Sequence, residues 1–110
     1  MEADAWVVEE VTTSAGRSRL REFIEGLTLE DKEEAAALIR ALSVRGNRMR
    51  EPDSKSLGQG LFELRGAQVR IFYTFRSGRR IILLGGLVKK RGNIPAAVLG
   101  HMRKLAKEVN

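Results

Sequence analysis

A carboxylate and several cations recur in the β-rich runs of the chain's second half. Side chains alternate along a strand, so Glu63 and Arg65 share one face of the run 61–65. Arg70 lies in the next run, and Lys89 and Lys90 follow the third. A base that deprotonates a hydroxyl, beside cations that stabilise charge growing on a phosphate, is a grouping suited to phosphodiester chemistry. The pattern alone favours a simpler alternative, a cross-strand salt-bridge ladder on a solvated sheet face.

Composition limits the chemistry further. The 110 residues include no cysteine, which excludes a disulfide framework, thiolate metal ligands and a cysteine nucleophile. The single histidine, His101, excludes a histidine-rich zinc site and is expected on a solvated helix face. We therefore expect no metal and no other cofactor.

The sequence indicates neither a membrane span nor a secretory signal. The longest apolar run, Ile81–Val88, has eight residues, far fewer than a transmembrane helix needs. The N-terminus lacks the basic and apolar regions of a signal peptide. We expect a cytoplasmic location and no membrane partner.

Charge is divided unevenly along the chain. Residues 1–39 hold ten acids and four bases, whereas residues 40–110 hold four acids and sixteen bases. A basic region of this kind is typical of a protein with a polyanionic partner, although a solvated basic surface fits equally well. Arginine outnumbers lysine eleven to five in residues 40–110, which favours phosphate recognition because guanidinium groups bind phosphate oxygens bidentately.

Apolar spacing predicts the element order β-α-α-β-β-β-α in one domain, residues 1–110. A strand at 6–11 precedes a helix with apolar positions 20, 23, 24 and 27 and a second helix that Thr28 caps and Gly46 ends. Residues 47–60 have the composition of an irregular polar loop. Strands at 61–65, 69–75 and 80–88 follow, and Pro95 begins a final helix.

This order is typical of an α+β domain with a mainly antiparallel twisted sheet and helices packed on one face. The open face would then gather Glu63, Arg65 and Arg70, with Lys89 or Lys90 at its rim. The acidic helices would bury their apolar stripes on the opposite face, away from the proposed site.

Three local features refine the strands. Trp6 is expected to anchor the first strand rather than bind a base. Ser77-Gly78 has the composition of a two-residue hairpin turn. The pair Gly85-Gly86 lies inside an apolar strand, which predicts a bulge or a close backbone approach rather than a phosphate loop.

Three ordered motifs occupy residues 55–95. They are Lys55-x-Leu57-Gly58-x-Gly60-Leu61-Phe62-Glu63-Leu64-Arg65, then Val69-Arg70-Ile71-Phe72-Tyr73, then Leu83-Leu84-x-Gly86-x-x-Lys89-Lys90 before Pro95. The set resembles the phage Gp49-like branch of the RelE/HigB toxins, the toxin halves of bacterial type II toxin–antitoxin pairs. The resemblance implies a single RelE-like toxin domain.

The resemblance also implies an activity, that of a metal-independent mRNA endoribonuclease that acts on the ribosome and inhibits translation. The ribose 2′-hydroxyl would attack the adjacent phosphate and leave a 2′,3′-cyclic phosphate and a 5′-hydroxyl. By this resemblance Glu63 is the general base or an orienting group, and Arg65 and Arg70 hold the phosphate. Lys89 or Lys90 would stabilise the transition state or protonate the leaving oxygen.

Further residues are candidates for RNA binding. Among them, Tyr73 shares a strand face with Ile71 and Phe75, so its ring is expected to pack in the core with the hydroxyl at a polar edge. The full set is Arg48, Arg50, Lys55, Arg91 and Tyr73.

The implied partners are mRNA, the ribosome and a cognate antitoxin of the helix-turn-helix kind. Two other functions remain open from the sequence. One is a non-enzymatic gyrase inhibitor of the ParE kind, which shares the fold but needs no phosphate-binding cluster. The other is a nucleic-acid-binding relic with weak or no catalysis.

Overall fold

The computed structural model describes residues 6–89 and 92–109. Five strands, three helices and a short 3₁₀ segment follow one another along the chain. They are β1 (Val7–Glu10), α1 (Arg19–Glu25), α2 (Leu29–Arg45), η1 (Gly46–Arg48), β2 (Ser54–Gly58), β3 (Leu61–Arg65), β4 (Val69–Arg76), β5 (Arg80–Val88) and α3 (Ala96–Glu108).

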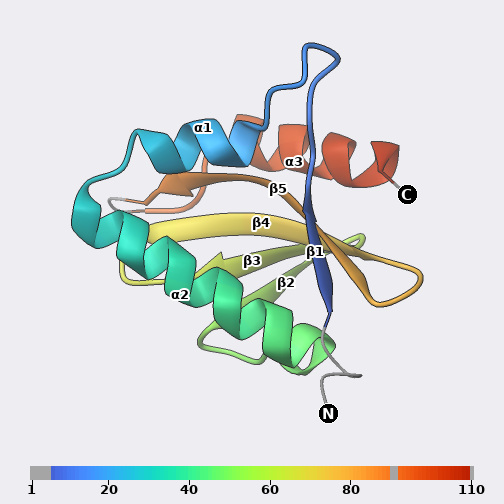
Figure 1. Ribbon diagram of the computed structural model, residues 1–110, viewed down its shortest axis with the longest axis horizontal. Coiled ribbons are helices and arrows are strands. Elements are labelled where there is room, and N and C mark those ends of the chain that lie inside the picture. The colour runs from blue at the N-terminus through green and yellow to red at the C-terminus, as the bar shows by residue number, and fades with distance from the viewer. Residues whose placement is uncertain (1–5, 90–91, 110) are drawn as a thin grey trace.

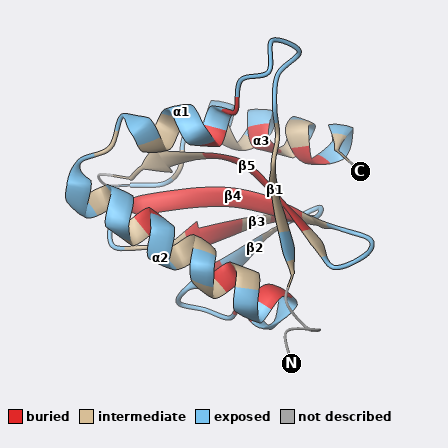
Figure 2. Ribbon diagram, in the orientation of Figure 1, coloured by how far each residue is buried: buried red, intermediate tan, exposed pale blue. Residues whose placement is uncertain are grey.

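The strands form one sheet in the order β1-β5-β4-β3-β2 (Figure 1). Strands β2 to β5 pair antiparallel with their neighbours, whereas β1 pairs parallel with β5. The chain is therefore the predicted α+β domain with a mainly antiparallel sheet. Burial is concentrated in β3, β4 and β5, the strands with neighbours on both sides (Figure 2).

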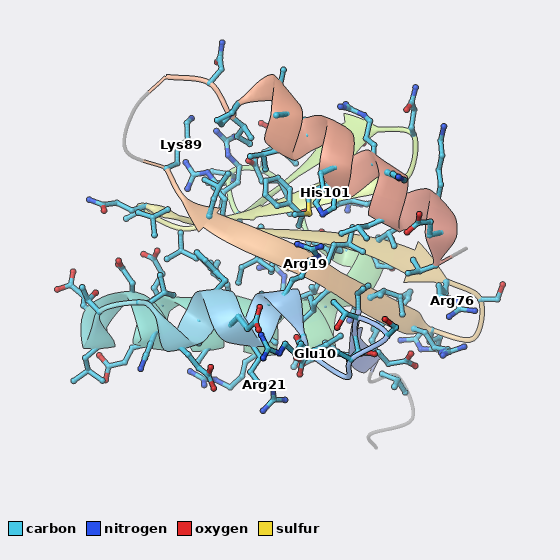
Figure 3. All side chains as sticks on the ribbon, turned by 90° about the horizontal axis from the view of Figure 1, so that it is seen from above. Glu10, Arg19, Arg21, Arg76, Lys89 and His101 are labelled. Atoms are coloured by element: carbon cyan, nitrogen blue, oxygen red, sulfur yellow. The ribbon has the colours of Figure 1, made fainter. Side chains whose placement is uncertain are left out.

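Helices cover both faces of the sheet, which corrects the expectation that all three lie on one face. The first core cluster joins α1 and α2 to one face through Leu20, Leu42 and Ile71. The second joins α3 to the other face through Met102 and Phe72. Figure 3 shows the sheet between α3 and the α1–α2 hairpin. The physical reason is that β5 is apolar on both faces, so each face needs a cover.

Part of the stretch 47–60, predicted to be irregular, forms β2, the edge strand beside β3. Lys55 pairs with Glu63 and Ser56 with Phe62, before a bulge near Gly58. The strand was missed because it is held by backbone pairing, and only Ser54 among its side chains is buried, so it has no apolar alternation.

Glycines shape β5 at the predicted position. Phe72 of β4 pairs with Gly85 and Tyr73 with Leu83, so one extra residue of β5 bulges between them. A Cβ at Gly86 would lie 2.5 Å from the ring of Phe23 and 2.8 Å from the Arg70 carbonyl oxygen. Both the bulge and the close approach are confirmed.

The hairpin between β4 and β5 is longer than predicted. Three residues, rather than two, separate Arg76 from Arg80. Gly78 and Arg79 both have positive φ angles, 84° and 58°. The sequence did not indicate the third residue because arginine seldom adopts this backbone conformation.

The predicted ends of α2 are confirmed. The Thr28 hydroxyl oxygen accepts a hydrogen bond from the Asp31 amide at 3.2 Å, and Gly46 ends the helix with a φ of 52°. The Trp6 indole fills the space that a Cβ at Gly46 would need and lies 5.3 Å from the Phe75 ring, so Trp6 anchors the chain before β1. Within the described residues, no helix combines the length and apolar character needed to cross a membrane.

Candidate active site

Strand register brings the predicted site residues together on one face. Residues paired across neighbouring strands point to the same side of a sheet. Lys55 of β2 pairs with Glu63 of β3, and Arg65 of β3 pairs with Arg70 of β4. Arg70 in turn pairs with Leu87 of β5, and Lys89 lies two residues farther along the chain. These residues therefore share the face that α3 covers in part.

A cavity of about 370 Å³ opens beside the N-terminal end of α3. Its charged lining comes from the sheet and its apolar wall from β2, α3 and the segment before α3. Figure 3 shows Lys89 on the α3 side of the sheet, away from α1 and α2. The lining residues are Lys55, Leu57, Glu63, Arg65, Lys89, Asn93, Ile94 and Leu99.

Glu63 is the buried acid of this cavity. The residue is 3% exposed, and its carboxylate oxygens lie 3.4 Å from Arg65 Nε and 3.8 Å from Arg70 Nε. A buried carboxylate is tolerated only where nearby positive charge offsets the loss of water. The two arginines therefore hold Glu63 in one orientation at the cavity wall.

Arg70 has a different environment from Arg65. Its side chain is 10% exposed, against 29% for Arg65. Arg70 Nη1 donates hydrogen bonds to the carbonyl oxygens of Gly66 at 2.6 Å and Val69 at 3.1 Å. Its buried Nε makes no hydrogen bond to any described residue, and it lies at ion-pair distance from Glu63. Arg70 is thus placed to orient Glu63, while Arg65 faces the cavity.

The geometry combines one acid with accessible cations. Glu63 can accept a proton, and Lys55, Arg65 and Lys89 can bind and stabilise negative charge on a group in the cavity. Across the described part of the chain there is no cluster of three or more histidine, aspartate or glutamate side chains able to hold a metal ion.

Not every predicted residue belongs to this site. Lys90 and Arg91 lie outside the described residues. Arg48 belongs to η1, and Arg50 lines a separate cavity of about 250 Å³ next to Phe62 and Phe75. Phe62 and Phe75 pack on the α1–α2 face, so the structure does not bring Arg50 to Glu63.

Tyr73 is a core residue, and its assignment to RNA binding stays a prediction. It is 1% exposed and belongs to the cluster on the α1–α2 face. Its hydroxyl lies 2.6 Å from Ser54 Oγ. Burial raises the pKa of the Tyr73 hydroxyl, and the hydrogen bond with Ser54 partly opposes that shift. The ring was expected to pack there because Tyr73 shares a strand face with Ile71 and Phe75.

The acidic hairpin lies on the face opposite the cavity, as predicted. Helices α1 and α2 pack on the first core cluster, and the cavity opens on the side of α3. His101 is exposed on α3, as expected for a solvated side chain (Figure 3).

Two residues near the site were not singled out from the sequence. Asn93 lines the cavity from the segment before α3, and Glu34 of α2 contacts the turn between β3 and β4. Asn93 could not be recognised because a polar residue in a loop does not by itself indicate a site. Glu34 lies within an acidic helix and cannot be distinguished there from solvated neighbours.

The fold is similar to that of a solved structure, described as the toxin–antitoxin complex RelBE2 from Mycobacterium tuberculosis. The TM-score is 0.58 at 17% sequence identity, over 77% of this chain and 99% of that chain. This chain and the matched chain therefore share their fold.

The family model described as Phage derived protein Gp49-like (DUF891) matches residues 22–107, a span that includes the whole cavity lining. The chain belongs to this Gp49-like family. No curated protein sequence matches the chain.

Proposed function

We propose that this chain is the toxin of a toxin–antitoxin pair and that it inhibits translation by cutting mRNA on the ribosome. The observation that supports this most directly is the single buried acid, Glu63, at the wall of a cavity whose other charged lining is cationic. RNA carries both groups that such a cavity can use, a 2′-hydroxyl to deprotonate and a phosphate to hold.

In the proposed reaction Glu63 accepts the proton of the ribose 2′-hydroxyl. The 2′-oxygen then attacks the adjacent phosphorus, and the bond from phosphorus to the 5′-oxygen breaks. Arg65 stabilises the charge on the non-bridging oxygens, while Lys89 donates a proton to the leaving 5′-oxygen. The products are a 2′,3′-cyclic phosphate and a 5′-hydroxyl. Glu63 then releases its proton to water, and Lys89 regains a proton from water.

Arg70 has an orienting role in this proposal. Its Nη1 donates hydrogen bonds to two backbone carbonyl groups, its Nε lies 3.8 Å from a Glu63 oxygen, and it does not line the cavity. Direct contact with the substrate phosphate therefore falls to Arg65 and Lys55, which line the cavity. Lys90 and Arg91 remain candidates for RNA contact next to Lys89.

An antitoxin partner is part of the same proposal. The similar solved structure is described as a toxin–antitoxin complex, which supports a partner of this kind here. A helix-turn-helix antitoxin is the form we expect. Its binding would need to block either the cavity or access of the protein to the ribosome.

The test is a transcriptome-wide map of new RNA 5′-hydroxyl ends, made minutes after the chain is expressed without its antitoxin. We expect ends clustered within translated codons. Ends spread through untranslated RNA would instead identify a ribonuclease that works without the ribosome. Growth arrest with no new ends would contradict cleavage and favour a gyrase target, and no arrest would favour a nucleic-acid-binding relic.

The same map of 5′-hydroxyl ends, made with the Arg65→Ala variant, tests the proposed site. Loss of the Arg65 charge should reduce the new ends by about two orders of magnitude or more, because it removes a transition-state contact to the phosphate. Arg76→Ala is the control, since Arg76 is exposed at the β4–β5 hairpin, at the other end of β5 from Lys89 (Figure 3). Full growth arrest by the Arg65→Ala variant would show that the proposed site is wrong.

A further inference from the structure

The turn between β3 and β4 is held from the opposite face of the sheet by one side chain of α2. Glu34 Oε2 accepts a hydrogen bond from the Ala67 amide at 3.0 Å, and Oε1 accepts one from the Val69 amide at 3.1 Å. The turn itself is closed by a hydrogen bond from the Gly66 amide to the Val69 carbonyl at 2.9 Å. A single carboxylate thus satisfies two backbone donors of this turn.

The carbonyl groups of the same turn hold the cationic part of the site. Gly66 and Val69 accept the two hydrogen bonds of Arg70 Nη1. The Gln68 carbonyl accepts a hydrogen bond from the Lys89 amide at 2.7 Å. The turn therefore fixes both the guanidinium that faces Glu63 and the backbone from which the Lys89 side chain extends.

The contact between α2 and the turn depends on a glycine. A Cβ at Gly66 would occupy the space now filled by the Glu34 carboxyl group. Any larger residue at position 66 would push the carboxylate away from the Ala67 and Val69 amides. The absence of a side chain at Gly66 and the length of Glu34 together permit the contact.

We propose that Glu34 is a positioning residue for the ribonuclease site, acting through the 66–69 turn on Arg70 and Lys89. This inference rests on the proposed function, because the step that it supports is RNA cleavage. Glu34 lies on the α1–α2 side and does not line the cavity, so it contacts neither substrate nor the reacting atoms. Glu34 would act on cleavage by fixing the turn whose carbonyl groups, those of Gly66, Gln68 and Val69, hold Arg70 and the Lys89 backbone.

The test compares Glu34→Gln with Glu33→Gln, its exposed neighbour on the same helix, in single-turnover cleavage of ribosome-bound mRNA. The amide of glutamine can accept from one turn amide but not from both. Because a misplacement of about 1 Å can cost about a hundredfold in rate, we expect Glu34→Gln to lower kcat by roughly tenfold to a hundredfold, with KM changed little. Glu33→Gln should match the wild type.

Two further variants separate positioning from a general loss of stability. Gly66→Ala displaces the Glu34 carboxylate without removing it and should lower kcat by a similar factor. In the background of Arg70→Lys, Glu34→Gln should cost little more, because the two changes disrupt the same chain of contacts. Equal kcat per folded molecule for Glu34→Gln and Glu33→Gln, or losses that multiply in the double variant, would overturn the proposal.

An NMR measurement keeps this inference distinct from the proposed function. The Nε–H signal of Arg70 and the backbone amide signal of Lys89 report the geometry directly. If the wild type cuts no RNA, the proposed function fails, yet Glu34→Gln should still shift both signals while Glu33→Gln leaves them in place. Unchanged signals in Glu34→Gln would overturn the positioning role whether or not the wild type cleaves RNA.

Discussion

At the scale of single residues, the burial of Glu63 between two arginines decides what the site can do. An exposed carboxylate would be hydrated and free to rotate, whereas Glu63 is 3% exposed and has arginine Nε atoms 3.4 and 3.8 Å from its two oxygens. The acid is therefore already oriented before a substrate enters, so the proposed proton transfer would need little reorganisation.

Replacement of Glu63 by glutamine should separate structure from chemistry. The amide keeps the shape and removes the base, so we expect single-turnover cleavage to fall by about 10² to 10⁴, the usual contribution of a general base. Circular dichroism and urea unfolding should show that the variant is folded. The control is Glu108→Gln, an exposed position at the end of α3. Cleavage within a few-fold of wild type would exclude Glu63 as the base.

The residue scale also shows what the sequence could and could not predict about the site. Glu63, Arg65, Arg70 and Lys89 were identified from strand alternation and from the family resemblance. The different roles proposed for the two arginines, phosphate contact for Arg65 and orientation of Glu63 for Arg70, were not predictable. They depend on which carbonyl groups of the turn accept hydrogen bonds from Arg70. Those carbonyl groups are backbone atoms, and their positions depend on strand register.

At the scale of elements, β1 is tied to the start of α1 by one acid. The Glu10 carboxylate accepts a 2.5 Å hydrogen bond from Ser18 Oγ and lies 2.9 Å from Arg21 Nη2 (Figure 3). The hydrogen bond with Ser18 is the main cause of a lowered Glu10 pKa; burial opposes it, and Arg21 adds to it. The link between the strand and the helix is therefore stronger when Glu10 is ionised than when it is protonated.

This link predicts a pH dependence of stability. A lowered pKa in the folded state means that the Glu10 contribution is complete above its ordinary pKa of 4.5 and is lost as the pH falls through the folded value. We expect the free energy of unfolding to decrease more steeply below pH 4.5 in the wild type than in Glu10→Gln. Urea unfolding across the acid range measures this, and identical slopes in both proteins would contradict it.

Two glycines, one in β5 against α1 and one on α3, are expected to respond in opposite ways to alanine. Gly86→Ala would place a Cβ against Phe23 and the Arg70 carbonyl oxygen, and overpacking of this kind costs about 1–3 kcal/mol. Gly100→Ala places a Cβ in open space on α3 and should stabilise the helix by up to about 1 kcal/mol. Urea midpoints compare the two, and no loss of stability in Gly86→Ala would show that β5 can move away from α1.

Most elements were predictable because their signals are local. Thr28 and Gly46 mark the ends of α2, and the glycine pair in β5 marks the bulge. The missed features depend on contacts distant in sequence. Strand β2 exists because β3 offers it backbone partners, and α3 crosses to the second face because β5 is apolar on both sides. Neither the existence of β2 nor the placement of α3 can be predicted from the local sequence pattern.

At the scale of the whole molecule, accessible cations are gathered on one face. The cavity with Lys55, Arg65 and Lys89 opens on the α3 side, whereas α1 and α2 together hold six acids and five bases on the other side. A polyanion would therefore be attracted mainly to the cavity side of the protein, and in the proposed function this attraction orients RNA during approach.

Salt dependence should measure this attraction. Each phosphate contact releases condensed counterions, so RNA affinity falls as the salt concentration rises. With the inactive Glu63→Gln protein as the probe, Arg65→Ala should reduce the slope of log K against log salt by about 0.7 to 1. Arg76→Ala should leave the slope unchanged. Fluorescence anisotropy with labelled RNA provides the measurement, and equal slopes for all three proteins would place the phosphate contacts elsewhere.

The parallel pairing of β1 with β5 has a consequence for synthesis. Val7 pairs with Arg80 and Glu10 with Leu83, so the first strand made by the ribosome pairs with the last. Contacts between such distant parts of a chain form late and slowly in folding. During translation β1 cannot pair until β5 has been made, and Lys89 follows directly after β5. A growing chain thus lacks the assembled cavity until these last segments have been added.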